Sequence, residues 1–175
     1  TITDFDATAD TFSFLSASGN SLSYTKGVNT KNEIQYSASD GTSVTLQGVY
    51  GATTYTIPSI GQSIYDHKGE DAIVNAPVNV SRYLYTAIYV DNEGTGSTIL
   101  TANGTVRGAV GQTDQTSAAD GIHVWNESTT KDLSITAKDV SGLDDGISAT
   151  NKGSGSLSIS VAGDVTSTST DTSDD

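Results

Sequence analysis

Two neighbouring stretches of the chain share one pattern: AADGIHVWNESTTKDLSITAKDV at Ala118–Val140 and LDDGISATNKGSGSLSISVAGDV at Leu143–Val165. A third copy, AIYVDNEGTGSTILTANGTV, precedes them at Ala87–Val106. The aligned residues Ile122 and Ile147 are 25 positions apart. A period of this length is typical of solenoid proteins, in which each repeat buries its apolar side chains against its neighbours.

Each copy alternates apolar and polar residues, which indicates β-strands rather than helices. Because successive side chains of a strand point to opposite faces, residues two apart share a face. Columns of similar residues result: Ile88, Ile122 and Ile147; Val90, Val124 and Ala149; Asn92, Asn126 and Asn151; Leu100, Ile135 and Ile159; Val106, Val140 and Val165. Three strands and three turns per repeat predict an all-β right-handed parallel β-helix with coils of about 25 residues.

The spacing is longer between the first two copies, because Ile88 and Ile122 are 34 positions apart. We assign the excess to a surface loop at Ala109–Ala118. For the asparagine column two interpretations stay open. Stacked Asn side chains can hydrogen-bond from coil to coil, or Asn can simply suit the turn that follows the strand.

Residues 1–70 lack this period, and we expect them to form an N-terminal β cap or atypical first coils. Two hairpins are predicted there, at Gly19-Asn20 and at Asp40-Gly41, the second with a type I′ turn. Residues 71–175 are then the regular coils. Since Asp174-Asp175 resembles the start of a further copy, we expect the natural protein to continue beyond this chain.

The composition supports a β-rich, acidic protein: 26 Thr, 24 Ser and 18 Gly accompany only 2 Pro, and the formal net charge is −13. Such a charge disfavours nucleic-acid partners, which need clustered Lys and Arg. No stretch is apolar enough for a membrane helix, so we expect no membrane insertion. The lack of Cys excludes disulfides and thiol catalysis.

The repeats DGIHVWNESTTKDLSIT and DDGISATNKGSGSLSIS resemble those of bacterial autotransporter passenger domains of the self-associating adhesin type. The resemblance covers Ala87–Asp175. It implies a protein exported across the outer membrane and displayed on, or secreted from, the bacterial cell surface. It also implies adhesion, aggregation or biofilm formation, and a role in virulence. The GDSGS motif of the protease members is absent.

Four of the five candidate binding residues lie at outward positions of the predicted strands. Tyr89 and His123 share one outer column and Asp91 and Trp125 share the next, whereas Asn126 belongs to the asparagine column and ends the first strand of the second copy. Trp125, the single Trp, is either exposed or covered by the loop Gln112–Ala118. Tyr83 and Tyr85 beside Arg82 either extend this surface or pack under the cap. Exposed aromatic side chains suit contact with a sugar or a protein.

We predict no catalytic residue and no bound cofactor. His67 is expected in a polar loop and His123 on the outside of a coil. One ion, calcium, could bridge the carboxylates at the corner where Asp120, Asp144-Asp145 and Asp174-Asp175 recur. The alternative explanation is that Asp before Gly makes a good turn.

The predicted function is therefore a surface adhesin without enzymatic activity, which binds a host protein or glycan or an identical chain. The alternative is a β-helical polysaccharide lyase or glycoside hydrolase. That enzyme would need a groove with convergent carboxylates and basic residues, and the chain has 8 Lys and Arg in total.

Overall fold

The computed structural model describes residues 21–111 and 119–168, with the side chains of residues 47–50 excepted. Within these ranges the chain forms strands and turns and no helix, so the predicted all-β class is confirmed. Accordingly, these residues include no apolar helix of membrane-spanning length. The chain divides into two compact units, Thr1–Gly51 and Ala52–Asp175.

The first unit contains a three-stranded antiparallel sheet. Its strands, in the order β1–β2–β3, are β1 (Tyr24–Val28), β2 (Glu33–Ala38) and β3 (Ser43–Tyr50). Ile34, Ala38 and Leu46 are buried in this unit. The hairpin predicted at Gly19-Asn20 lies outside the described residues.

The hairpin predicted at Asp40-Gly41 does join β2 to β3, but the prediction of a type I′ turn is wrong. The Gly41 amide donates to the Ala38 carbonyl over 3.0 Å. Gly41 has a φ of +88°, whereas Asp40 is not among the described residues with positive φ. A type I′ turn needs positive φ at both central positions. The connection is instead a three-residue loop that ends in a left-handed glycine, which glycine adopts without steric cost.

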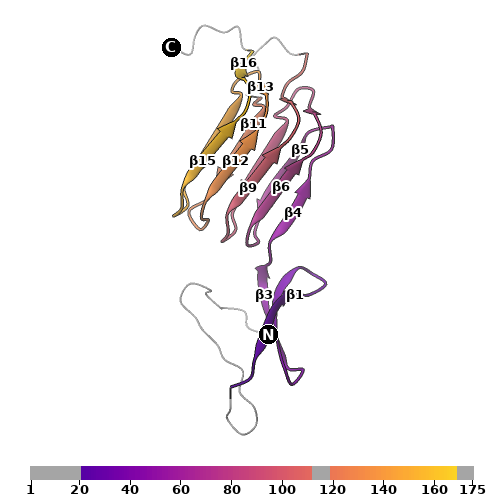
Figure 1. Cartoon of the computed structure of the whole chain (residues 1–175), viewed down its shortest axis with the longest axis vertical. Helices are drawn as coiled ribbons and strands as arrows, with labels where there is room; N and C mark the ends of the chain where they lie inside the picture. Colours follow the sequence, from indigo (N-terminus) through magenta and orange to yellow (C-terminus); the bar gives the residue numbers. More distant parts are fainter. Residues whose placement is uncertain (1–20, 112–118, 169–175) are drawn as a thin grey trace. The chain divides into compact units, whose positions relative to one another are not determined.

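The second unit consists of three parallel sheets, and each repeat supplies one strand to each. The strands of the largest sheet lie side by side in Figure 1. They are β4 (Thr53–Thr56), β6 (Ala72–Ala76), β9 (Thr98–Ala102), β12 (Leu133–Ala137) and β15 (Leu157–Val161). The next has β5 (Gln62–His67), β8 (Ile88–Asn92), β11 (Ile122–Asn126) and β14 (Ile147–Asn151). The third has β7 (Val80–Ser81), β10 (Val106–Arg107), β13 (Val140–Gly142) and β16 (Val165–Ser167).

The predicted columns of similar residues are confirmed by the strand register. In the β8–β11–β14 ladder, Ile122 pairs with Ile88 on one side and with Ile147 on the other. Ile135 lies between Leu100 and Ile159 in the largest sheet, and the Val106, Val140 and Val165 column runs through the third. All of these pairs are parallel, so the columns do not face one another across antiparallel sheets.

The inward side chains of the three sheets form one apolar core. Strands β6, β8 and β11 alternate strictly between buried and half-buried positions. Each fully buried aliphatic side chain contributes about 1.5–3 kcal/mol. In the last repeat Leu157 and Ile159 remain 47% and 45% exposed, because no described strand lies beyond β15.

The parallel pairing also includes two strands that precede residue 70. β4 and β5 pair in parallel with β6 and β8, in the stretch for which we expected a cap or atypical first coils. The repeat is hidden in the sequence there because the register of β5 shifts between Ile64 and His67. The capping role of the N-terminal residues, and continuation after the last repeat, stay predictions.

The longer spacing between the first two copies leaves the ladder intact. Ile88 and Ile122 are direct partners even though 34 positions separate them. The residues that take up the excess follow β10, and residues 112–118 among them lie outside the described ranges. The length of this connection therefore does not set the register.

Candidate functional site

The outward side chains of β5, β8 and β11 include four aromatic rings, and we call Tyr65, Tyr89, His123 and Trp125 the aromatic face. Tyr89, His123 and Trp125 are half-buried, whereas Tyr65 is 66% exposed. They alternate with buried inward residues such as Val90. Four of the five predicted site residues, the three rings and Asp91, thus lie on one outer face, as expected.

Three rings of this face form a continuous column. Tyr65 and Tyr89 have centroids 5.1 Å apart, and Tyr89 stacks on His123 at 5.1 Å with planes 13° apart. The spacing follows from the register, since Tyr89 and His123 are direct partners and neighbouring strands lie about 4.8 Å apart. Burial, followed by the charge of Asp91, raises the pKa of Tyr89, so its hydroxyl stays protonated at neutral pH.

The His123 ring is held by a buried carboxylate. Its Nδ1 lies 2.7 Å from Oδ2 of Asp120, a residue that is only 5% exposed. The other oxygen of Asp120 accepts the backbone N–H of Asp145 over 3.2 Å. Because an ionised carboxylate only accepts hydrogen bonds, Nδ1 carries the hydrogen. The ring orientation is thereby fixed.

Trp125 is held by polar contacts at its edge and face. Its Nε1 donates to Glu127 over 2.8 Å, and the Lys152 ammonium lies 4.2 Å from the ring centroid. The loop predicted to cover Trp125, Gln112–Ala118, lies outside the described residues, so that alternative stays a prediction.

Asn126, the fifth predicted residue, points inward. It is fully buried, as is Asn92. The Thr98 hydroxyl accepts from Asn92 over 2.8 Å and donates to Asn126 over 2.7 Å, and Asn126 donates to Asn151 over 3.3 Å. The hydrogen bonds between repeats support the ladder interpretation of this column. A partner at the surface would not reach Asn126.

A hollow of about 330 Å³ adjoins the ring column. It crosses the start of β5, β8, β11 and β14, where Ser63, Tyr89, His123 and Ser148 occupy matching register positions. Two small serines therefore flank two rings along the line of strands.

Arg82 forms the basic wall of the hollow. Its Nη1 donates to the Ser63 hydroxyl over 2.8 Å and to the Thr86 carbonyl over 3.3 Å. The guanidinium also lies 5.1 Å from the centroid of Tyr85, which is 59% exposed. Tyr83 is 65% exposed, so Tyr83 and Tyr85 extend the exposed aromatic surface beside Arg82.

The loop that carries Arg82 is fixed by the backbone of a second loop. The Val110 amide donates to the Arg82 carbonyl over 3.1 Å, and the Ala109 amide to the Tyr85 carbonyl over 3.0 Å. Leu84, between them, has a φ of +71°, a conformation that non-glycine residues seldom adopt. The surrounding contacts hold it there, so Arg82 and Tyr85 are presented by an ordered turn.

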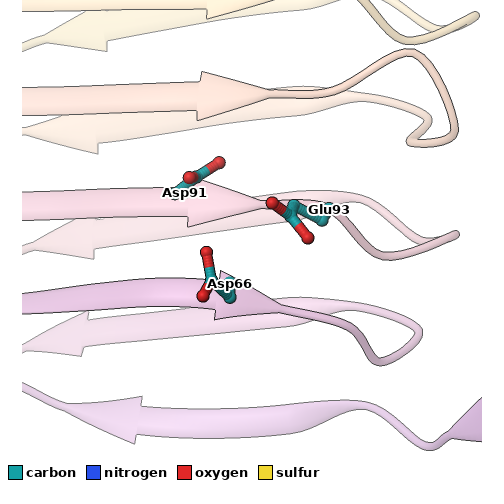
Figure 2. Close-up of side chains that lie close together, drawn as sticks. All are labelled: Asp66, Asp91 and Glu93. Carbon is teal, nitrogen blue, oxygen red and sulfur yellow. The ribbon is translucent and has the colours of Figure 1, made fainter. Parts of the chain in front are cut away.

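Acidic side chains gather at the other end of β5 and β8. Figure 2 shows Asp66 on β5 close to Asp91 and Glu93, and one carboxylate oxygen of each lies within 4.8 Å of the others. Oδ1 of Asp91 is buried and has no hydrogen-bond partner. Burial, followed by the charges of Glu93, Asp66 and Glu127, raises the pKa of Asp91. Lys68 brings a positive charge to this cluster, with its Nζ 3.6 Å from Oε2 of Glu93.

This cluster is not where calcium was predicted. At the predicted corner, both oxygens of Asp120 are engaged by His123 and by the Asp145 amide, and Asp174-Asp175 lies outside the described residues. Sequence reasoning missed the Asp66–Asp91–Glu93 cluster because the register shift in β5 brings Asp66 beside β8. Calcium binding stays a prediction.

The expectation of His67 in a polar loop is wrong. His67 ends β5, is 4% exposed, and pairs in register with Asn92. Its ring nitrogens lie 2.9 Å from the Tyr55 hydroxyl and 3.3 Å from the Glu70 carbonyl. Burial lowers the pKa of His67. It thus takes the place of an asparagine in the first position of the inward column.

Sequence reasoning did not connect Asp120 with His123, and it left open whether the residues around Arg82 join the face. The spacing Asp120-x-x-His123 was the available signal, since it puts a carboxylate at the turn just before the strand that carries the ring. Comparisons of the chain with protein-family models, curated proteins and solved structures gave no match. The function is therefore argued from the geometry of this face and from the resemblance of the repeats.

Proposed function

We propose that Ala52–Asp175 is a right-handed parallel β-helix that serves as an adhesive module on a bacterial surface. Two features support the coil. Every repeat supplies strands to the same three parallel sheets in the same order, and crossover connections between parallel strands of one sheet are right-handed in nearly all proteins. Handedness and closure of the coils would be read directly from an experimental structure.

The aromatic face is the observation that carries the adhesive function. Its ring column continues from strand to strand, and Tyr83 and Tyr85 add two further exposed rings. Contiguous apolar patches on a protein surface often mark an interaction site. Tyrosine suits this task because it offers a rigid apolar ring together with a polar hydroxyl.

The proposed partner is a host-surface protein or glycan, or an identical chain. The net charge of −13 disfavours polyanions such as nucleic acids. Export and display as an autotransporter passenger follow from the resemblance of the repeats and form part of the same proposal.

The enzymatic alternative is favoured by one observation, the meeting of carboxylates with His123 at the hollow. However, Asp120 is committed to holding His123 and the Asp145 amide. We therefore propose binding without catalysis, and the test includes a search for glycan degradation.

The test compares bacteria that display the wild-type chain with bacteria that display Tyr65→Ala/Tyr89→Ala. The double variant should lose clumping or surface attachment. The matched control is Ser134→Ala/Thr136→Ala, which changes two outward side chains of β12 and should behave as wild type. Equal adhesion by all three would refute the proposed face. Release of sugar from glycans without clumping would favour the enzyme.

A further inference from the structure

We propose that the hollow beside the ring column binds one unit of a neutral saccharide. This inference rests on the proposed function, because it assigns a ligand class to part of the adhesive face. The inference concerns the hollow that lies across the starts of β5, β8, β11 and β14. It assigns no ligand to the rest of the aromatic face.

The size of the hollow suits one sugar ring. Its volume of about 330 Å³ is near the lower end of the range for small-molecule sites, roughly 300–1,000 Å³. Along the four paired strands, Tyr89 and His123 lie between the small side chains of Ser63 and Ser148. A ligand seated over Ser148 would meet the side of the His123 ring that does not face Tyr89.

The walls offer both kinds of contact that a sugar needs. The rings of Tyr85 and His123 can pack against its C–H groups, whereas the Tyr89 ring lies between Tyr65 and His123 and only borders the hollow. The guanidinium of Arg82 has five N–H donors in a planar fork, and its Nη1 donates to Ser63 and Thr86, so further donors remain for hydroxyl oxygens. Asp145 is exposed at the rim and can accept from hydroxyl groups.

The charge of the lining selects against anionic sugars. The lining contains one guanidinium, that of Arg82, and the three carboxylates of Asp120, Asp144 and Asp145. An acidic sugar would bring a further negative charge into this surrounding and would be repelled. Neutral sugars carry no such penalty.

The polar groups are held in place before any ligand arrives. Asp120 joins three parts of the wall: its backbone N–H donates to the Thr86 hydroxyl over 3.1 Å, and its carboxylate holds His123 and the Asp145 amide. Preorganisation of this kind lowers the entropy lost on binding. Asp120 is therefore a positioning residue of the site.

The binding test uses saturation-transfer NMR on the whole 175-residue chain. The neutral probes are the methyl glycosides of glucose, galactose and mannose, and the comparison probes are N-acetylneuraminic acid and Nα-acetyl-lysine amide. At least one neutral glycoside should bind with a dissociation constant on the order of 1 mM. Stronger binding of either comparison probe would overturn the inference, and preference for the lysine probe would indicate a basic peptide instead.

Two variants locate the binding. Ser148→Phe would continue the ring column and fill the hollow, and Arg82→Lys keeps the charge but removes the planar fork. Each should weaken binding of the glycoside by about tenfold or more. The matched control is Ser134→Phe on the outer side of β12, which should bind as wild type. Undiminished binding by Ser148→Phe would place the ligand elsewhere and overturn the inference.

The adhesion assay separates this inference from the proposed function. If no neutral glycoside binds but Tyr65→Ala/Tyr89→Ala abolishes adhesion, the saccharide site is refuted and the adhesive face stands. If a glycoside binds in the hollow but Tyr65→Ala/Tyr89→Ala and Ser148→Phe both adhere as wild type, the sugar site stands and the adhesive function is refuted.

Discussion

The two faces of each parallel sheet share one backbone and one register but have very different side chains. On the inner face, columns such as Ile88, Ile122 and Ile147 repeat one residue type. On the outer face, the column beside it changes from Tyr89 to His123 to Ser148. Burial forces similarity, since an inward residue must fit the neighbours above and below it. The outer face is free of that constraint and can carry recognition.

The largest expected effect comes from the inner face of β12. Ile135→Ala should lower the free energy of unfolding by about 2–5 kcal/mol, because it opens a cavity at a side chain that is 1% exposed. Urea denaturation measures the change. The control is the outward neighbour Thr136→Ala, which should stay within about 0.5 kcal/mol of wild type. Equal losses at both positions would contradict the division between the faces.

A second test concerns the polar column inside the core. Asn126→Ala should cost about 1–3 kcal/mol, since the buried hydroxyl of Thr98 loses the acceptor of its hydrogen bond. The same denaturation experiment applies. Asn151→Ala should cost less, because Asn151 is only half-buried. A larger loss at Asn151 would show that the column does not act as an internal ladder.

The single tryptophan allows a test of one contact on the outer face. Lys152→Gln removes the ammonium over the Trp125 ring and should cost about 0.5–1 kcal/mol. Because the chain has one Trp, its fluorescence reports the surroundings of Trp125 alone, and the emission should change when Lys152 is replaced. Lys138→Gln, at an exposed position after β12, is the control and should leave the emission unaltered. Identical spectra for both variants would place Lys152 away from the ring.

The smallest effect, and one of opposite sign, is expected for Asp91→Asn. Removing one of three neighbouring carboxylates should stabilise the protein at neutral pH by roughly 0.2–1 kcal/mol, the size of a cross-strand charge pair. The pKa of Asp91 is raised in the folded state. The contribution of Asp91 to the free energy of unfolding is therefore complete below the unfolded pKa near 3.8, where the side chain is protonated, and is lost as pH rises through the folded pKa. The gain should therefore vanish in thermal melts near pH 3.5.

Calcium gives the same cluster a second readout. If these carboxylates bind the ion, added calcium chloride should raise the melting temperature of the wild type relative to a sample with EDTA, and Asp91→Asn should remove that rise. A melting temperature independent of calcium would show that the cluster carries only repulsion.

The inner face was predictable from the sequence and the outer site only in part. Alternation and a fixed period place Ile122 and Val124 inward, so Tyr89, His123 and Trp125 had to point outward. The start of the parallel pairing was not predictable, because the irregular register of β5 breaks the period. Arg82 joins the site through a loop whose path depends on contacts with Ala109 and Val110, which no local pattern encodes.

The long connection between β10 and β11 has a consequence for how such a molecule can change. Ile88 still meets Ile122 although this corner holds more residues than the next one. Loop entropy rises only slowly with length, so a peptide grafted between Gly111 and Ala119 should be accommodated at modest cost. Evolution or an engineer can thus add an epitope or a new recognition element at this corner while the scaffold that carries it keeps its pairing.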